Sequence, residues 1–280
     1  MRLSTRQWHI LVATDYTEAA RYGIKAAAAL ASAVDGRISV VAVEPHGEAA
    51  ATGVAAAADA PTSEELNRLR RWAAPELGTH PSSFAIKYGL PGIEISRYAE
   101  QSEADLVIMV RKRRSKMSRA LSGDTVDSVV RRSVVPCLLV PPETVQLTGV
   151  VAALDGTDRG MVVFREALEL ATATGQPLAA LTVEPLRANE PAVLAAQVPT
   201  GRSLLLQESV QGIMGGEAAA PVIIRRGDIV EQVLAEMRDR VGSVLAVGYH
   251  RGGPPGLIEA GSSGRRLLQQ SPGPVLTVPL

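Results

Sequence analysis

Residues 150–157 read VVAALDGT, an apolar run that ends in an acidic residue, a glycine and a threonine. Residues 10–17 read ILVATDYT, 140 positions earlier, and end in the same acidic residue and threonine. Later landmarks recur at an offset of 138, since Gly123 and Gly261 each stand thirteen residues before a proline that opens an apolar run. A repeat of this length indicates two whole domains rather than the short units of a solenoid.

The length supports this division, because 280 residues make two domains of ordinary size. We expect one domain at residues 1–145 and the other at 146–280. Lysine plus arginine and aspartate plus glutamate each number 29, so no chain-wide attraction to nucleic acid or anionic membranes is expected. Aromatic residues make up only 3%, which leaves few platforms for stacking the bases of single-stranded nucleic acid.

The single cysteine, Cys137, lies in an apolar run and is expected to be a buried core thiol. One cysteine also excludes a disulfide within the chain. The sequence shows neither a signal-like start nor an apolar run of about 18 residues. We therefore expect a cytoplasmic protein that does not associate with membranes.

Strand and helix patterns alternate in the same order in both halves. In the first half we expect strands at 8–14, 37–44, 83–88, 104–110 and 137–140 and helices at about 17–33, 63–77, 91–102 and 125–132, with Thr17 and Ser63 as N-caps. In the second half we expect strands at 149–154, 177–183, 221–225, 243–248 and 275–278 and helices at about 158–174, 201–214, 229–241 and 263–270. The alternation predicts right-handed crossovers, and hence two tandem, doubly wound, Rossmann-like α/β folds. Each has a five-stranded parallel sheet between layers of helices.

Ligands of such sheets bind beyond the carboxyl ends of the strands, and three features of the second half fall there. Asp155 ends the first strand, GYHRGGPPG (248–256) follows the fourth, and Gly261-Ser262-Ser263 precedes the last helix. A carboxylate can accept hydrogen bonds from ribose hydroxyls or an adenine amino group. Glycines let backbone N–H groups approach a phosphate, and a helix N-terminus favours an anion.

Each feature also has a structural interpretation. Asp155 could cap the first helix, the glycines could form a surface loop, and the glycine–serine pair could be an ordinary helix cap. Their joint occurrence after the expected strands favours nucleotide binding.

These residues resemble the universal stress protein family, as two tandem copies. Its nucleotide-binding members carry Gly-x2-Gly-x9-Gly-Ser/Thr after the fourth strand. Gly248 matches the first glycine, Gly261 the third and Ser262 the hydroxyl, whereas Arg251 replaces the second glycine and Gly252 follows it. The resemblance implies the family's adenine-nucleotide α-hydrolase-like fold. It also implies that ATP, with or without Mg²⁺, is bound without catalysis, in the second domain only.

Two further correspondences complete the implied site. Asp155 matches the family's acidic residue after strand one, and Val183 falls near the strand-two position whose backbone meets adenine. His250 and Arg251 would add positive charge. The full set of expected nucleotide-binding residues is Asp155, Gly156, Thr157, Val183, Gly248, His250, Arg251, Gly252, Gly261, Ser262 and Ser263.

The first half resembles the same family with its phosphate motif lost. Val110 and Arg113 stand at the first two glycine positions, and Asp124 at the hydroxyl position. A β-branched valine blocks close backbone approach, and an aspartate at a helix N-terminus repels phosphate. We therefore expect no ATP binding of the family type in this half.

A basic run, Arg111-Lys112-Arg113-Arg114-Ser115-Lys116, replaces the glycine loop. It is either a site for an anionic partner or a solvated loop paired with nearby acids. Because no aromatic residues are interleaved with it, it is weak evidence for nucleic acid. The role of the alanine-rich segment at 48–60 is left open.

No catalytic motif is evident. The four histidines lack metal-ligand spacing, and the sequence contains neither a Walker A motif nor a Gly-x-Ser-x-Gly elbow. We expect a non-enzymatic protein that acts in stress response or signalling through partner surfaces. The alternative is a nucleotide-free scaffold in which both sites are degenerate. The resemblance also suggests that the final strands, Cys137–Val140 and Val275–Val278, pair across the two halves. A homodimer of tandem chains is a further expectation that no residue pattern indicates.

Overall fold

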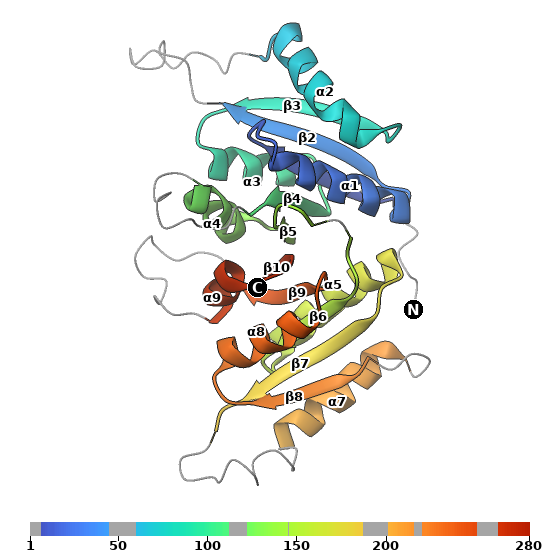
Figure 1. Cartoon of the computed structure of the whole chain (residues 1–280), viewed down its shortest axis with the longest axis vertical. Helices are drawn as coiled ribbons and strands as arrows, with labels where there is room; N and C mark the ends of the chain where they lie inside the picture. The colour runs from blue at the N-terminus through green and yellow to red at the C-terminus, as the bar shows by residue number, and fades with distance from the viewer. Residues whose placement is uncertain are drawn as a thin grey trace. The chain divides into compact units, whose positions relative to one another are not determined.

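The computed structural model of the protein describes residues 7–44, 60–111, 122–144, 146–186, 201–215, 220–250 and 263–280. The chain divides into two compact units, Met1–Val145 and Gln146–Leu280, and each unit is an α/β domain (Figure 1). Most of the alanine-rich segment and of the basic run lie outside the described residues.

The first unit, blue to green in Figure 1, contains a parallel sheet in the order β3-β2-β1-β4-β5. Helices α1 and α2 pack against each other, and so do α3 and α4. The strands are β1 (His9–Thr14), β2 (Arg37–Glu44), β3 (Ser82–Tyr88), β4 (Leu106–Val110) and β5 (Cys137–Val140). The helices are α1 (Ala20–Val34), α2 (Ser63–Leu77), α3 (Pro91–Gln101) and α4 (Ser122–Arg132).

The second unit repeats this arrangement, with a parallel sheet in the order β8-β7-β6-β9-β10. Here α5 packs with α7, and α8 with α9. The strands are β6 (Val150–Leu154), β7 (Leu178–Glu184), β8 (Val222–Arg226), β9 (Val244–Tyr249) and β10 (Val275–Pro279). The helices are α5 (Asp158–Thr174), α7 (Gly201–Met214), α8 (Ile229–Asp239) and α9 (Ser263–Gln270).

The central strands explain why the sheets are covered on both faces. Ile10, Leu11 and Val12 of β1 are all fully buried, although successive strand residues point to opposite faces. Val150 and Val151 of β6 are buried in the same way. Continuous apolar strands of this kind need helices on both faces. The predicted doubly wound parallel fold is therefore confirmed in both halves.

Two helices begin differently from the sequence prediction. Helix α1 begins at Ala20, because a separate turn precedes it in which Thr17 Oγ1 accepts from the Ala20 N–H at 3.3 Å. The N-cap of α2 is Thr62 rather than Ser63. Thr62 Oγ1 accepts from the Glu65 N–H, and the Glu65 carboxylate accepts from the Thr62 N–H. This reciprocal pair satisfies two helix-end donors at once.

Within the part of the chain that the structure describes, no helix is both long and apolar enough to span a bilayer.

Candidate functional site

Asp155 follows β6 directly and orders the turn into α5. Its Oδ1 accepts hydrogen bonds from the Thr157 N–H at 3.0 Å and from the Thr157 hydroxyl at 2.7 Å. Thr157 is in turn the N-cap of α5, and its Oγ1 accepts from the Gly160 N–H at 3.3 Å. A Cβ at Gly160 would lie 2.8 Å from Asp155 Oδ1, so a glycine is needed for this close approach. The carboxylate thus has a structural role, although Asp155 remains exposed at the carboxyl edge of the sheet.

Gly156 adopts the left-handed conformation, with φ of 71°. The Arg202 guanidinium, from the first turn of α7, covers it. Arg202 Nη2 donates to the Asp155 carbonyl, and its Nε would lie 2.8 Å from a Cβ at position 156. Sequence reasoning missed Arg202, because it lies 47 positions from Asp155 and no motif marks it.

Gly248 lies inside β9 rather than after it, since the strand continues to Tyr249. A Cβ at Gly248 would lie 3.2 Å from Val163 Cγ2 and 2.5 Å from Leu280 Cδ1. A Cβ at Gly264 would lie 3.3 Å from the Gly248 carbonyl oxygen. The amino end of α9 therefore approaches the end of β9 closely, and Gly248 has a packing role that its motif did not indicate.

The remaining predicted residues are distributed as follows. Val183 lies one residue before the end of β7 and pairs with Arg225. His250 follows β9 and is exposed, and Ser263 begins α9. Arg251, Gly252, Gly261 and Ser262 lie outside the described residues. The described residues of the predicted site thus lie at or next to the carboxyl ends of β6, β7 and β9, at one edge of the sheet.

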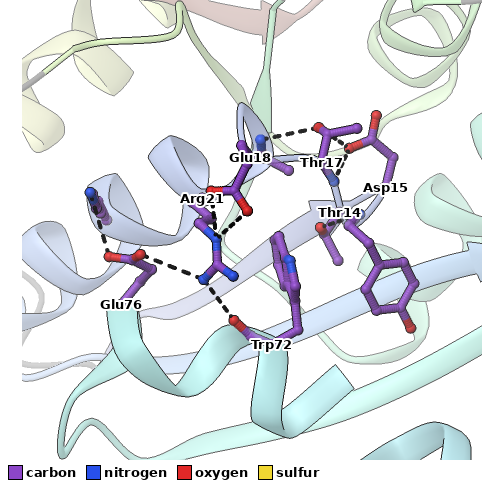
Figure 2. Close-up of polar contacts among 10 residues, drawn as sticks. Thr14, Asp15, Thr17, Glu18, Arg21, Trp72 and Glu76 are labelled. Atoms are coloured by element: carbon purple, nitrogen blue, oxygen red, sulfur yellow. Dashed lines mark hydrogen bonds and ion pairs between the residues drawn. The ribbon is translucent and has the colours of Figure 1, made fainter. Parts of the chain in front are cut away.

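The first unit makes the same turn after β1. Asp15 Oδ1 accepts from the Thr17 N–H at 3.1 Å and from the Thr17 hydroxyl at 2.5 Å. Tyr16 occupies the position of Gly156 and is also left-handed, with φ of 59°. Figure 2 shows the turn beside α1, with Asp15 and Thr17 directed toward each other.

Helix α2 packs aromatic and cationic groups against this turn. The Trp72 ring meets the Tyr16 ring edge to face at 5.7 Å, and the Arg68 guanidinium lies 5.3 Å from the Tyr16 centroid. Arg21 lies over the Trp72 ring and donates to the Trp72 carbonyl at 2.9 Å (Figure 2). Burial raises the pKa of the Tyr16 hydroxyl, against the opposing effect of Arg68. These contacts hold a non-glycine residue in a conformation that L-residues rarely adopt.

The degenerate phosphate motif of the first unit lies at the corresponding edge. Val110 ends β4, and its Cγ2 would lie 3.2 Å from a Cβ at Gly23 of α1. Arg111 is only 8% exposed, and its backbone N–H donates to the Val140 carbonyl at 2.8 Å. The first residue of the basic run therefore belongs to the edge of the folded sheet and not to a solvated loop. Asp124 lies in the first turn of α4.

His9 is a packed histidine at the opposite, amino edge of the first sheet. It is 3% exposed, its Nδ1 lies 2.8 Å from the Ser102 carbonyl oxygen, and its Nε2 lies 2.6 Å from Ser39 Oγ. Burial lowers its pKa, and the nearby Arg37 lowers it further. Among the described residues, no three histidine, cysteine, aspartate or glutamate side chains gather as metal ligands do.

The two units match one family model separately. The model of the universal stress protein family matches residues 8–141 and 148–279. The chain belongs to the universal stress protein family. This tandem universal stress protein is also 25% identical over 194 residues to Universal stress protein Rv2319c of Mycobacterium tuberculosis strain H37Rv. That match covers 64% of this chain and 66% of the relative, just under two thirds of its length.

Solved structures show the same fold over the whole chain. A universal stress protein from Archaeoglobus fulgidus DSM 4304 superposes with a TM-score of 0.72 at 18% identity, covering 97% of this chain and 98% of that one. The functionally unknown protein PA1789 of Pseudomonas aeruginosa PAO1 superposes with a TM-score of 0.66 at 14% identity, covering 98% and 93%. At these identities the likeness concerns the fold.

Proposed function

We propose that the second unit binds an adenine nucleotide, with ATP as the expected ligand, and holds it without catalysing a reaction. The observation that carries this proposal is the contrast between Gly248 and Val110. Near the end of β9, beside the amino end of α9, the second unit has a glycine, whereas the first unit has a β-branched residue at the end of β4. The side chains of Val163 and Leu280 pack against Gly248, so the contrast concerns the backbone that the glycine leaves without a side chain of its own. A nucleotide phosphate needs backbone N–H groups that it can approach closely.

The residues at this edge of the sheet have the chemistry that the ligand requires. Asp155 would accept hydrogen bonds from ribose hydroxyls or the adenine amino group, and the backbone of Val183 would meet adenine. His250, Arg251 and Gly252 would line the phosphates with Gly261, Ser262 and Ser263. A magnesium ion accompanying ATP would be held mainly by phosphate oxygens and water. The protein would then act in stress response or signalling, by presenting a nucleotide-dependent surface to a partner.

Isothermal titration of the full chain with ATP tests the proposal. Asp155→Ala and Gly261→Asp are each expected to weaken binding at least tenfold. Asp15→Ala is the matched control, because Asp15 makes the same pair of hydrogen bonds to Thr17 that Asp155 makes to Thr157. If losing this type of turn weakened ATP binding only by disturbing the fold, Asp155→Ala and Asp15→Ala would both weaken it. Loss of binding in Asp15→Ala alone would place the ligand in the first unit and contradict the proposal.

The second candidate function is that of a nucleotide-free scaffold. It is favoured by the contacts around Asp155. Its carboxylate makes the same pair of hydrogen bonds to Thr157 that Asp15 makes to Thr17 in the first unit, and Arg202 covers the neighbouring Gly156. Mass spectrometry of the supernatant after denaturing freshly purified protein distinguishes the two. Released adenine nucleotide supports the first proposal, whereas no released nucleotide together with no titration heat supports the scaffold.

A further inference from the structure

The second unit has a hollow at the edge of its sheet opposite the nucleotide site. Its volume is about 460 Å³, within the range of about 300–1,000 Å³ typical of small-molecule sites. It lies where β6, β7 and β8 begin and where α5 and α7 end. Its apolar lining includes Val151, Leu168, Leu178, Ala179, Met214 and Pro221.

The internal repeat identifies what fills the corresponding place in the first unit. Leu11 pairs with Ser39 as Val151 pairs with Ala179. Because strand register fixes the equivalence, Gly149 corresponds to His9, and Ala179 corresponds to Ser39.

The comparison shows which groups the second unit lacks. In the first unit the His9 imidazole is buried and bonds to both the Ser102 carbonyl, at the end of α3, and the Ser39 hydroxyl. In the second unit a hydrogen atom replaces the imidazole at Gly149, and a methyl group replaces the hydroxymethyl group at Ala179. Both positions line the hollow.

Polar groups remain at the place where the ring is missing. Thr148 Oγ1 donates to the Val241 carbonyl at 2.8 Å and lies 3.4 Å from Ser243 Oγ. Since the Thr148 proton is directed at that carbonyl, the Ser243 hydroxyl donates to Thr148, and its own oxygen can accept from a ligand. Arg240 also lines the hollow, with its Nε donating to the Glu236 carboxylate at 2.7 Å. The described lining residues include no carboxylate, so a cationic ligand would lack a counter-charge there.

We propose that this hollow is a second binding site, for a small, flat, uncharged nitrogen heterocycle that carries an N–H donor. The ring would lie beside Gly149 and Ala179, at the place that corresponds to the His9 imidazole of the first unit, and its N–H would reach the Ser243 oxygen. The site is independent of the proposed nucleotide site.

Benzimidazole, which is uncharged above neutral pH and carries one N–H, is a suitable probe. Titration of the ¹⁵N-labelled full chain is expected to give saturable shifts of the Gly149, Ala179 and Ser243 amides at millimolar probe. 1-Methylbenzimidazole, which lacks the N–H, is expected to bind several-fold more weakly. Equal binding of the two probes would overturn the donor requirement, and no saturable shift with benzimidazole would overturn the site.

Two kinds of variant locate the binding. The graft Gly149→His/Ala179→Ser/Ser243→Asp copies His9, Ser39 and Asp105 of the first unit and should abolish benzimidazole binding. Because the graft could disturb folding, Thr172→Trp on the exposed side of α5 blocks the hollow in a second way. Arg165→Trp, also exposed on α5 but away from the hollow, is its control and should bind normally. Unchanged binding in both the folded graft and Thr172→Trp would contradict the proposal.

Discussion

Val163 packs directly against Gly248, and the first unit makes the same helix–strand contact with the valine and the glycine exchanged between the two elements. In the second unit the valine is on the helix and the glycine on the strand, with 3.2 Å between Val163 Cγ2 and the Cβ position of Gly248. In the first unit Gly23 is on the helix and Val110 on the strand, again at 3.2 Å. Each unit thus keeps one bulky residue at this helix–strand contact. The glycine at 248 therefore has a packing reason in addition to any role with a ligand.

This exchange predicts a compensating pair of substitutions. Gly248→Val should destabilise the second unit by about 1–3 kcal/mol, because it overpacks the contacts with Leu280 and Val163. Adding Val163→Gly copies the first unit and should recover part of the loss, with a coupling energy of about 0.5–3 kcal/mol. Urea unfolding followed by circular dichroism measures both. If the effects of the two substitutions on the free energy of unfolding simply add, the contact with Val163 does not determine which residue can stand at position 248.

The double variant also separates packing from nucleotide binding. A folded Gly248→Val/Val163→Gly chain that no longer binds ATP would indicate that the glycine acts on the ligand itself. A folded double variant that binds ATP as the native chain does would indicate that Gly248 serves packing alone.

Gly156 and Gly212 offer a matched test of backbone strain. Gly156→Ala should cost about 1–2 kcal/mol, because an L-residue is disfavoured in the left-handed conformation that Gly156 adopts, with φ of 71°. Gly212 lies inside α7 with nothing within 4 Å of its Cβ position, so Gly212→Ala should stabilise by up to about 1 kcal/mol. Urea midpoints of the two variants compare these effects directly. A Gly156→Ala variant as stable as the native chain would show that the turn relaxes.

The sequence predicted the fold closely because its signals are local and redundant. Residues 37–44 form β2 as expected, since four β-branched residues, Ile38, Val40, Val41 and Val43, lie between a helix stop and a charged end and favour a strand. The start of α1 was misplaced because Thr17 caps a single turn and the helix begins only at Ala20. The helix propensities of these residues do not distinguish a helix that begins directly after Thr17 from a capped single turn followed by a helix.

The site was less predictable, because its contacts join distant segments. The Asp155 turn follows from three consecutive residues, and a structural role for Asp155 at the start of the helix was predictable, but the N-cap itself is Thr157. Arg202 over Gly156 depends on how α7 packs, and no residue pattern near Asp155 indicates it. The hollow beside Gly149 is lined by residues of α5, α7, β6 and β7 that lie far apart in the sequence, so no local pattern indicates it.

Glu236 is a buried carboxylate whose loss should be costly. It is 6% exposed and accepts from Arg225 Nη2 at 2.6 Å and from Arg240 Nε at 2.7 Å. Burial alone would raise its pKa, but the hydrogen bonds from Arg240 and Arg225 outweigh burial and lower it. Glu236→Gln should therefore destabilise the second unit by about 1.5–3 kcal/mol at neutral pH. Glu94→Gln, at a partly exposed i,i+3 pair with Arg97, is the control and should change stability by about 0.5 kcal/mol or less. Equal effects in urea unfolding would show that the Glu236 cluster adds nothing beyond a surface pair.

His9 should make the first unit less stable as the pH falls. Its folded-state pKa lies below the ordinary value of 6.5, chiefly because burial disfavours the charged ring. The unfolded state therefore binds the proton more readily, so the stability that neutral His9 supports is fully present above 6.5 and declines as the pH falls below it. The only two tryptophans, Trp8 and Trp72, belong to the first unit, so tryptophan fluorescence follows the unfolding of this unit.

A urea series between neutral and mildly acidic pH measures the effect. The fluorescence midpoint of the native chain should fall with pH, whereas His9→Gln, which cannot take up a proton, should show a flatter dependence. His80→Gln is the control, because His80 contacts Ser32 at an exposed position and its replacement should leave the slope unchanged. A pH dependence of the midpoint that persists in His9→Gln and disappears in His80→Gln would assign the titration to His80 and contradict the prediction. His9 would then take up its proton equally in the folded and the unfolded state, which contradicts a folded-state pKa lowered by burial.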